Sequence, residues 1–586
     1  MRIFMDLWWY FKQEKWKYLI GIIFLMCSSL ISMLPPYVVG VIVDAIRKRT
    51  LTPAVLGKWV VILAVAGVIS YTAGFIWRQM IFGSSVRLAR LLRDRLFHHF
   101  TKMSPGFFNK RRIGDLMAHS TNDILAVQDA AGEGILTLID SISMGGMVII
   151  SMITLVSWKL TLIALIPMPF LAWATSYYAS LLHKRFHKAQ AAFSELNDKV
   201  QENIAGVRVI KAFGQEEAQK DMFRKQSADV VSKNIAVAKA DALFDPTITF
   251  IVGMCYLLSL SFGAVFVVHG SMTIGQLTSF TLYLGQLIWP MLAFGLLFNI
   301  VERGRASYGR ICKLLEIRPE IVDHKGALDF VPSGNVSFNI NNLIYPKKTI
   351  PALKDIHFSL SQGQTLGVVG KTGSGKTTLL KLMLREFDCE DGDIQIGGLS
   401  IYDVKLAKLR EAIGYVPQDH FLFSATIAEN IAFAEPGASM KDIERVAKLA
   451  NIHDDILEFE EGYDTVVGER GVTLSGGQKQ RISIARALLI NPEILILDDS
   501  LSAVDAHTEE AILQALKDNR DNKTTLISAH RLSAIQHADL ILVLEDGQIV
   551  ERGTHETLMA NDNWYASMFR RQQLESLVEQ GGVIYE

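Results

Sequence analysis

The stretch Leu366-Gly-Val-Val-Gly-Lys-Thr-Gly-Ser-Gly-Lys-Thr-Thr378 decides the fold of the second half of the chain. A strand pattern leads into a glycine loop, and the loop leads into the start of a helix. Gly370 through Thr377 matches GxxxxGK[ST], in which backbone N–H groups surround phosphate oxygens at a helix N-terminus. Lys376 is expected to reach the β- and γ-phosphates, and the Thr377 hydroxyl is expected to bind Mg²⁺. The strand before and the helix after distinguish the loop from an ordinary glycine-rich turn.

A second apolar run, Ile494–Leu497, delivers two adjacent carboxylates, Asp498 and Asp499. Parallel α/β sheets place their chemistry at the C-terminal ends of buried strands, so we expect this strand beside the phosphate-loop strand. Asp498 would hold Mg²⁺ directly or through water, and Asp499 would face the γ-phosphate and the attacking water. A third buried strand, Thr524–Ser528, ends near His530, for which a phosphate-facing role is favoured over a structural one.

The first half of the chain has a different character. The chain has 586 residues, 50% hydrophobic and 20% charged, with a formal net charge of −1. A net charge so close to zero gives no overall positive electrostatic potential that would attract nucleic acid. Six uncharged stretches are near or above the ~20 residues that a membrane helix needs. These six predicted spans are Tyr18–Val43, Trp59–Trp77, Ser141–Trp158, Leu160–Leu182, Pro246–Val268 and Gly270–Val301. The third and fourth, separated by Lys159, should form a tight hairpin.

The intervals 78–140 and 183–245 are long and rich in Lys and Arg, which predicts that they are cytoplasmic. The short run Arg47–Arg49 disagrees with that orientation. Phe186–Val209 reads as continuous helix, so spans four and five should extend beyond the bilayer. No cleavable signal is expected. The N-terminal segment fits an amphipathic piece at the membrane surface, anchored by Trp8, Trp9 and Trp16, or an ordinary cytoplasmic helix end.

The character of the chain changes again near Glu316. Pro319, Gly326 and Pro332 punctuate a polar linker, and β-like runs alternate with helical patterns after Gly334. The sequence therefore predicts a membrane domain over 1–320, a linker over 321–333 and an α/β domain with a parallel sheet over 334–586. The four cysteines lack metal-binding spacing and are expected to be free thiols.

The segment Leu474-Ser-Gly-Gly-Gln478 precedes a helical run and alone predicts only a helix cap. Together with the phosphate loop, Asp498 and His530, in this order, it gives the chain its resemblance to an ABC transporter half of the multidrug-exporter class. The resemblance covers nearly the whole length. It implies a membrane α-helical domain of six spans followed by an α/β P-loop NTPase domain with a helical subdomain. It also implies ATP and Mg²⁺ as ligands.

The resemblance assigns further residues. Gln418 resembles the Q-loop glutamine, Tyr345 the aromatic that stacks on adenine, and His530 the switch histidine. Ser502–Asp505 resembles the D-loop, and Val467–Gly471 a segment that touches the membrane domain. Asp499, His530 and Gln418 would be catalytic, and Thr377, Gln418 and Asp498 would bind the metal. The remaining ATP contacts would be Tyr345, Gly370, Lys371, Thr372, Gly373, Ser374, Gly375, Lys376, Thr377, Thr378, Ser475, Gly476, Gly477, Gln478 and Asp505.

The family places the signature of one nucleotide-binding domain across the ATP held by another. One set of motifs therefore implies a dimer with two ATP sites. Phe107–Asp115 and Gly206–Gly214 resemble the family's two coupling regions, which press on the nucleotide-binding domains. As an alternative, each is a solvated helix–loop–helix.

Asp499 departs from the family pattern, which usually has Glu at this position. Asp is shorter by one methylene, roughly 1.5 Å, and displacing a catalytic group by about 1 Å can cost on the order of a hundredfold in rate. We therefore expect this site to bind ATP but to hydrolyse it slowly. Such a chain resembles the BmrC-type half of bacterial heterodimeric multidrug exporters, whose partner half supplies a Glu. The alternative is a homodimer that turns over slowly at both sites.

Hydrophobic or amphipathic compounds are the cargo that the resemblance implies, carried across the cell membrane by a multi-pass protein with a cytoplasmic N-terminus and nucleotide-binding domain. Two alternatives remain open: a lipid flippase driven by the same ATP-binding domain, and an ATP-binding regulator or channel. The six spans exclude a soluble ABC protein. Asp140 marks either a pathway or a helix cap. Packing or lipid contact is the favoured role of the span aromatics Phe170, Trp173, Trp289, Phe294 and Phe298, over lining a cargo cavity.

Overall fold

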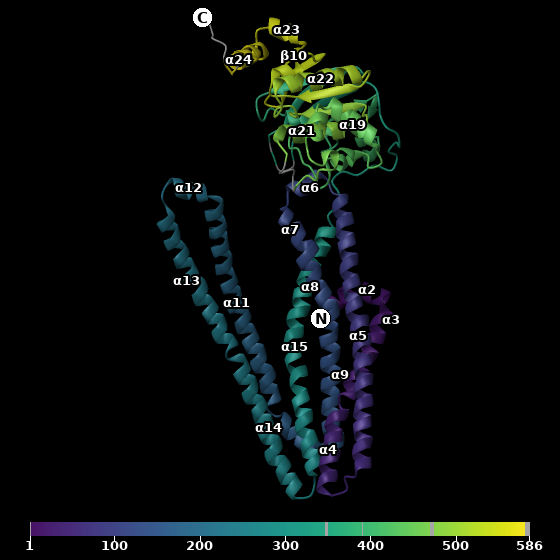
Figure 1. The fold of residues 1–586 in the computed structure, drawn as a ribbon, viewed down its shortest axis with the longest axis vertical. Helices are drawn as coiled ribbons and strands as arrows, with labels where there is room; N and C mark the ends of the chain where they lie inside the picture. Colours follow the sequence, from purple (N-terminus) through teal and green to yellow (C-terminus); the bar gives the residue numbers. More distant parts are fainter. Residues whose placement is uncertain (1, 346–347, 349, 390, 469–473, 580–586) are drawn as a thin grey trace. The chain divides into compact units, whose positions relative to one another are not determined.

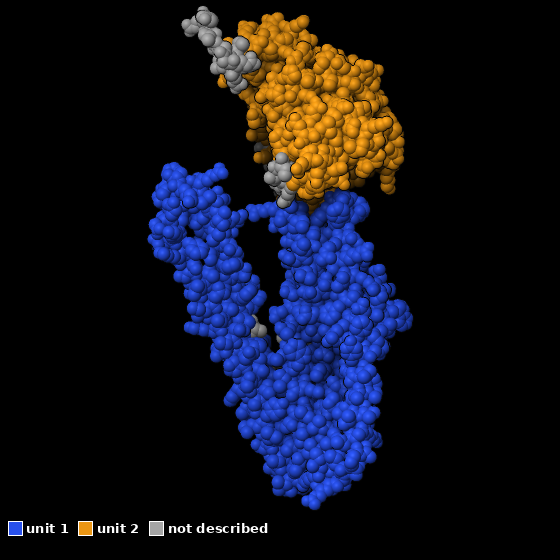
Figure 2. Space-filling model, viewed as in Figure 1, with its two compact units in different colours: residues 1–102, 111–318 blue, residues 103–110, 319–586 orange. Residues whose placement is uncertain are grey.

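The structure is a computed structural model, and it describes residues 2–345, 348, 350–389, 391–468 and 474–579 (Figure 1). The chain divides into two compact units, coloured separately in Figure 2. Unit 1 comprises residues 1–102 and 111–318, and unit 2 comprises residues 103–110 and 319–586. Residues 107–110 of the first expected coupling region therefore group with unit 2, and its residues 111–115 group with unit 1.

The described residues of unit 1 form helices joined by short connections, and no strands. Its elements are α1 (Arg2–Asp6), α2 (Trp8–Gln13), α3 (Lys15–Ile31), α4 (Leu34–Arg47), α5 (Pro53–Thr101), α7 (Ile113–Ala118), η1 (His119–Asp123), α8 (Ile124–Asp129), η2 (Ala130–Gly134), α9 (Ile135–Ser151), η3 (Met152–Ser157), α10 (Trp158–Leu165), α11 (Met168–Ala205), α12 (Val207–Ala212), α13 (Glu216–Asp241), α14 (Phe244–Val268) and α15 (Ile274–Leu315).

Five helical segments of the described chain are long and apolar enough to cross a membrane. They are Lys15–Arg47, Pro53–Thr101, Ile113–Leu165, Glu216–Val268 and Ile274–Leu315. The fourth expected span, Leu160–Leu182, is absent from this set because its helix is interrupted. Helix α10 ends at Leu165, and α11 begins at Met168, directly after Pro167, whose ring cannot continue a helix. The count of six spans remains a prediction.

The expected hairpin lies close to its predicted place. Ser157 has extended backbone angles (φ −162°, ψ 120°), and its hydroxyl accepts a hydrogen bond from the Leu160 amide. Ser157 is therefore the N-cap of α10 and lies two residues before Lys159. The expected continuous helix over Phe186–Val209 is wrong at its end, because α11 stops at Ala205. Gly206 leaves helical geometry, and the separate short helix α12 follows.

Helices α11 and α13 pack against each other and form an arm, joined at its tip by α12 (Figure 1). The Arg185 guanidinium donates to the Ala236 carbonyl across the arm (2.7 Å). Figure 2 shows open space between this arm and the rest of unit 1 over part of their length. Large apolar side chains along the arm are exposed: Phe186, Phe193, Ile204, Val209, Phe213, Phe223, Val231 and Ile235.

The N-terminal tryptophans do not share one role. Trp8 and Trp16 are exposed, as surface anchors would be. Trp9 was wrongly grouped with them: its indole N–H donates to the Tyr308 hydroxyl (3.1 Å), and the Arg95 guanidinium lies over its ring. Trp9 therefore packs within unit 1.

Unit 2 contains two sheets. Its strands are β1 (Val336–Leu343), β2 (Leu353–Leu360), β3 (Thr365–Gly370), β4 (Asp391–Ile396), β5 (Leu399–Ser400), β6 (Ile413–Val416), β7 (Ile494–Asp498), β8 (Thr524–Ser528), β9 (Leu540–Glu545) and β10 (Gln548–Gly553). The larger sheet has the order β10-β9-β3-β8-β7-β6 and is parallel except for β10. The smaller sheet, β2-β1-β4-β5, is antiparallel and was not expected from the sequence.

The strand order corrects one sequence expectation. Strand β7 does not lie beside the phosphate-loop strand β3, because β8 lies between them and pairs with both. All five residues of β7 and of β8 are buried, as the sequence predicted for both strands. Both strands still end at the same edge of the sheet as β3, since all three are parallel.

The helices of unit 2 complete the layers. They are α6 (Pro105–Asn109), α16 (Lys376–Met383), α17 (Leu406–Glu411), α18 (Ile427–Ile431), η4 (Ala432–Ala434), α19 (Met440–Leu449), α20 (His453–Leu457), η5 (Gly462–Asp464), α21 (Gly476–Leu489), α22 (Ala506–Asn519), η7 (Leu532–Ile535), α23 (His555–Ala560) and α24 (Trp564–Glu579). Helices α18 to α21 pack on one another and form the helical subdomain. None of the four cysteines, all of them among the described residues, forms a disulfide.

An ion pair between the half-exposed Arg310 and the buried Asp123 joins α15 to the π-helical turn η1 in unit 1. Asp123 is nearly buried and accepts two hydrogen bonds from Arg310, one of them from Nε at 3.0 Å. We predict that Arg310→Ala lowers stability by about 1–3 kcal/mol, because it leaves a buried acceptor without its main partner. Thermal unfolding of the purified chain measures this loss. Adding Asp123→Ala should recover part of it; a double variant as unstable as the sum of the singles would contradict the pairing.

Candidate functional site

The phosphate loop connects β3 to α16. Gly375 precedes α16 with a left-handed backbone (φ 105°), which favours glycine. A Cβ atom there would lie 2.8 Å from Leu353 Cδ2 and 3.0 Å from the Ala352 carbonyl oxygen. Both the backbone angle and the space therefore require glycine. The loop also contacts the turn between β9 and β10, because the Gly547 amide donates a hydrogen bond to the Ser374 carbonyl (3.1 Å).

Two polar groups of the loop indicate a place for an anion. The Lys376 ammonium donates to the carbonyls of Gly370 (2.8 Å) and Lys371 (3.1 Å), and its side chain is buried. Burial lowers the pKa of Lys376, while Asp499 and Asp498 oppose this shift. The Ser374 hydroxyl oxygen is buried and has no hydrogen-bond partner among the described residues. An orphaned buried hydroxyl beside a buried ammonium fits phosphate oxygens.

Asp498 lies at the end of β7, next to the first turn of α16. Its Oδ1 accepts a hydrogen bond from the Thr377 hydroxyl (3.1 Å), and its Oδ2 accepts one from the Tyr415 hydroxyl (3.4 Å). Burial raises the pKa of this carboxyl, and the Thr377 hydrogen bond partly offsets the rise. Tyr415 on β6 was missed by sequence reasoning, although its place three residues before Gln418 was a usable signal.

These groups fit Mg²⁺. A hydroxyl and a carboxylate are hard oxygen ligands, and Mg²⁺ on nucleotides is held by one or two protein oxygens with phosphates and water completing the shell. No group of three or more His, Cys, Asp or Glu side chains that could hold a metal occurs among the described residues. The third expected ligand, Gln418, is bonded to Asp499 rather than to Asp498.

Asp499 is held in an unusual backbone conformation, with φ 49°. Its amide donates to the Ser528 carbonyl (2.9 Å), and its carbonyl accepts from the Ser502 hydroxyl (3.0 Å). Its Oδ2 accepts from the Gln418 side-chain amide (3.2 Å). A left-handed residue other than glycine is strained and is common at functional sites. The backbone is therefore fixed on both sides, and the reach of the carboxylate is set by its single methylene.

His530 follows β8 at the same edge of the sheet. Its ring is exposed, and it lines a small cleft together with Asp499. Its carbonyl accepts a hydrogen bond from Gln572 on α24 (2.8 Å). Tyr345 lies by the start of α16, where its hydroxyl donates to Thr378 (3.0 Å) and its ring packs edge-on against Phe387. Asp499, His530 and Tyr345 thus come from three separate segments that converge around the phosphate loop.

The signature segment begins α21. Ser475 caps this helix by accepting from the Gln478 amide, while the Gln478 side chain accepts from the Ser475 amide. Among the described residues no hydrogen bond or ion pair joins 475–478 to the phosphate loop 370–378. The segment lies instead against the D-loop: a Cβ on Gly477 would lie 3.0 Å from the Ala503 carbonyl oxygen.

Asp505 caps α22 by accepting from the Thr508 amide (2.9 Å), and this hydrogen bond lowers the pKa of its carboxyl. Sequence reasoning missed Gln480, which is buried and accepts from the Ala503 amide (3.0 Å), so that it ties the D-loop to α21. Of the expected segment Val467–Gly471, residues 469–471 lie outside the described residues.

The comparisons with known proteins identify the family of the chain. The family "ABC transporter transmembrane region" matches residues 18–291, and the family "ABC transporter" matches residues 353–502. The chain is 47% identical over 581 residues to "Multidrug resistance-like ATP-binding protein MdlA" of Escherichia coli (strain K12), covering 99% of this chain and 98% of that protein. The chain belongs to the ABC transporter family. It joins a membrane region to an ATP-binding region, as exporters of this family do.

The chain is also similar to a flippase and to an exporter of known structure. The "ATP-dependent lipid A-core flippase" of Syntrophus aciditrophicus (strain SB) is 34% identical over 524 residues, covering 89% of this chain and 86% of that protein. The solved structure of a bacterial Atm1-family ABC exporter with ATP bound has a TM-score of 0.77 and 26% identity, and it covers 95% of this chain and 99% of that one. The chain is thus an ATP-hydrolysing transporter of the membrane.

The phosphate loop gives a direct test. We predict that Gly375→Ala weakens ATP binding by at least about tenfold, or about 1.4 kcal/mol, because the loop must shift to admit a methyl group. A fluorescent ATP analogue titrated into the purified chain measures the affinity. Gly437→Ala is the matched control, since a Cβ at Gly437 meets nothing within 4 Å; equal affinity in both variants would contradict the assigned role of the loop.

Proposed function

We propose that this chain is one half of a dimeric exporter that moves hydrophobic or amphipathic compounds across the cell membrane, and that its own ATP site hydrolyses slowly. The observation that carries the second part is Asp499, at the end of β7, where its carboxylate bonds the Gln418 amide (3.2 Å). The partner is a second half-transporter that carries Glu at the corresponding position. Thr377, Asp498 and Gln418 would hold Mg²⁺, which neutralises charge on the phosphates when bound.

In this site, different residues serve the binding of ATP and its hydrolysis. The Lys376 ammonium, the Ser374 hydroxyl and the loop amides bind the β- and γ-phosphates, and Tyr345 packs on the adenine. Asp499 orients the attacking water, and His530 contacts the γ-phosphate. Since the backbone of Asp499 is fixed by its bonds to Ser528 and Ser502, a carboxylate one methylene short cannot be moved forward. The water is therefore poorly placed, and ATP persists in the site.

The dimer is supported by two features. Ser475–Gln478 bond none of the described phosphate-loop residues, which supports a role of this helix N-terminus toward a nucleotide held by another subunit. The arm of α11, α12 and α13 exposes apolar side chains outside the predicted spans, among them Phe193 and Phe213. Exposed apolar surface of this kind is typical of an interface. A heterodimer gives one fast and one slow site; a homodimer would give two slow sites.

Six spans remain our proposal for the topology, with the fourth formed by α10 and the first part of α11 around Pro167. In this topology the cytoplasm would contain both coupling regions, unit 2 and the N-terminus. The first coupling region, Phe107–Asp115, runs from the end of α6 to the start of α7, and its Lys110 pairs with Glu320 within unit 2 (2.5 Å). The second forms α12 at the tip of the arm.

The cargo rests on the relatives. The name of the Escherichia coli relative is multidrug resistance-like, which supports export of hydrophobic compounds. The lipid A-core flippase keeps lipid transport as the second candidate. The span aromatics give little guidance: Phe170, Trp173, Trp289 and Phe298 are exposed, and the side chain of Phe294 lies outside the described residues. Asp140 is half-buried, next to Ser29 of α3.

We predict that Asp499→Glu raises ATP hydrolysis at this site by on the order of ten- to a hundredfold. The assay is steady-state ATPase of the full-length chain in lipid nanodiscs, with Lys376→Ala as the inactive control. Fast turnover by the unsubstituted chain alone, unchanged by Asp499→Glu, would contradict a slow site.

We predict that membrane vesicles containing the chain and a Glu-bearing partner half accumulate a hydrophobic cation such as ethidium when ATP is added. Lys376→Ala in this chain should abolish accumulation, since both sites share its ATP-driven closure. Movement of a fluorescent phospholipid without movement of ethidium would favour the flippase, and no ATP-dependent movement of either would favour a regulator or channel.

A further inference from the structure

The helix that begins at the phosphate loop ends at a strained residue. Arg385 has a left-handed backbone (φ 49°) directly after the last turn of α16. Its amide donates to the Leu382 carbonyl (2.9 Å), and the Glu386 amide donates to the Lys381 carbonyl (3.1 Å). This pair of hydrogen bonds is a Schellman motif, whose left-handed position usually holds glycine. An arginine there costs backbone energy, which directs attention to its side chain.

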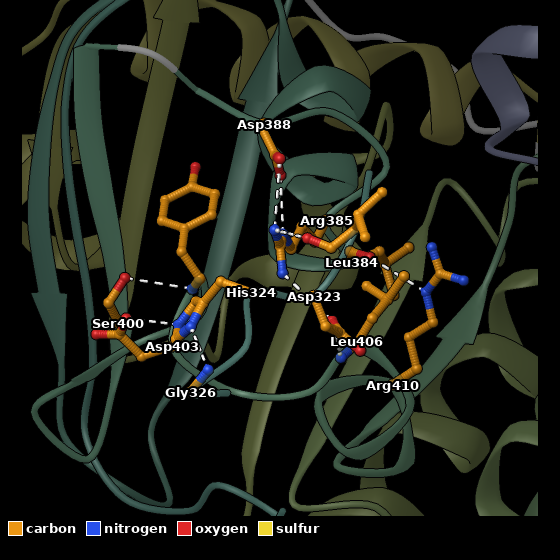
Figure 3. Close-up of polar contacts among 12 residues, drawn as sticks. Asp323, His324, Gly326, Leu384, Arg385, Asp388, Ser400, Asp403, Leu406 and Arg410 are labelled. Atoms are coloured by element: carbon orange, nitrogen blue, oxygen red, sulfur yellow. Dashed lines mark hydrogen bonds and ion pairs between the residues drawn. The ribbon is translucent and has the colours of Figure 1, made fainter. Parts of the chain in front are cut away.

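The Arg385 side chain joins α16 to the linker that follows α15 (Figure 3). Its guanidinium is buried and donates to Asp388 (2.8 Å) and to the Val322 carbonyl (3.4 Å). It also forms an ion pair with Asp323 (3.8 Å) and lies over the Tyr402 ring. Val322 and Asp323 follow shortly after the end of α15 at Leu315. The linker is thus bonded to the far end of the phosphate-loop helix.

Asp323 makes a second connection. Its Oδ1 accepts a hydrogen bond from the Leu406 amide (2.9 Å), the first residue of α17, so it caps that helix from outside. Helix α17 leads into β6, which ends two residues before Gln418. Arg410 of α17 donates to the Leu384 carbonyl at the end of α16 (3.4 Å), which closes a triangle of linker, α16 and α17 (Figure 3).

The linker around Asp323 is fixed rather than a free tether. The His324 ring contacts Asp403 (3.2 Å), and the Leu328 amide donates to the Asp403 carbonyl (2.8 Å). The Lys405 amide returns a hydrogen bond to the Leu328 carbonyl (3.0 Å). A displacement of α16 or α17 would therefore reach the linker through short polar contacts, and the nearest of these is Asp323.

We propose that Asp323 and Arg385 connect the linker after α15 to α16, which carries Lys376 and Thr377, and to α17, which leads through β6 toward Gln418. Nucleotide at the phosphate loop shifts or stiffens α16 and β6, and the Asp323–Arg385 contact passes this change to the linker. The connection lies within one chain and is separate from the two coupling regions. Contacts that only stabilise unit 2 would leave the linker unchanged when nucleotide binds.

The test is hydrogen–deuterium exchange of the full-length chain in lipid nanodiscs, with and without saturating ATP and Mg²⁺. In the unsubstituted chain, nucleotide should slow exchange of the linker peptide 316–326 by about tenfold. Arg385→Gly and Asp323→Ala should abolish this response while changing the ATP dissociation constant by less than about twofold. Because glycine suits the left-handed position, Arg385→Gly should keep the melting temperature of the unsubstituted chain.

Asp329→Asn is the matched control. Asp329 also lies in the linker segment and pairs with Lys405 (2.6 Å), but both side chains are exposed and neither contacts α16. This variant should keep the response. The proposal is overturned if the linker response persists in Arg385→Gly and Asp323→Ala, if Asp329→Asn abolishes it equally, or if the unsubstituted chain shows none with ATP bound. Neither cargo nor hydrolysis enters this readout, so a failure of the proposed export function would leave it intact.

Discussion

The hydrogen bond from the Thr377 hydroxyl to the Asp498 carboxylate (3.1 Å) is the contact on which the rest of the site depends. It joins the first turn of α16, which carries the phosphate loop, to the end of β7, which carries both acids. Asp498 also accepts from Tyr415 on β6, so the ends of two strands and the start of one helix meet at one carboxylate. A buried carboxylate is costly unless its oxygens are bonded, and this need fixes the arrangement of all three elements.

Asp499 shows how the same arrangement limits the chemistry. The strand end that buries Asp498 forces the next residue into a left-handed backbone, with its amide bonded to Ser528. Its side chain then points toward Gln418, and nothing in the backbone can extend its reach. The short side chain is therefore a local property of one residue within an otherwise complete phosphate site. Binding groups and hydrolytic groups come from different elements, so the first can persist when the second is weakened.

Sequence patterns predicted much of this, for identifiable physical reasons. Strand β7 begins with four aliphatic residues in a row, and the phosphate loop has a fixed spacing of glycines, so both could be located before the structure. Strand order could not, because β8 follows β7 in the chain yet lies between β7 and β3. The antiparallel sheet was missed although β1 alternates apolar and polar residues, because all the β-like runs were assigned to one parallel sheet. The interruption at Pro167 was visible as a proline, but its effect on the helix depends on tertiary packing. The contacts of Arg385 had no sequence signal at all.

Our central proposal is that this chain's own site holds ATP and hydrolyses it only slowly. Photo-crosslinking of 8-azido-ATP to the assembled transporter, after turnover and removal of free nucleotide, tests it most directly. Nucleotide labelled at the α-phosphate and nucleotide labelled at the γ-phosphate should be retained on this chain in equal amounts, since the bound species is intact ATP. Retention of the α-label alone would show that the γ-phosphate has been cleaved and lost, which would contradict the claim.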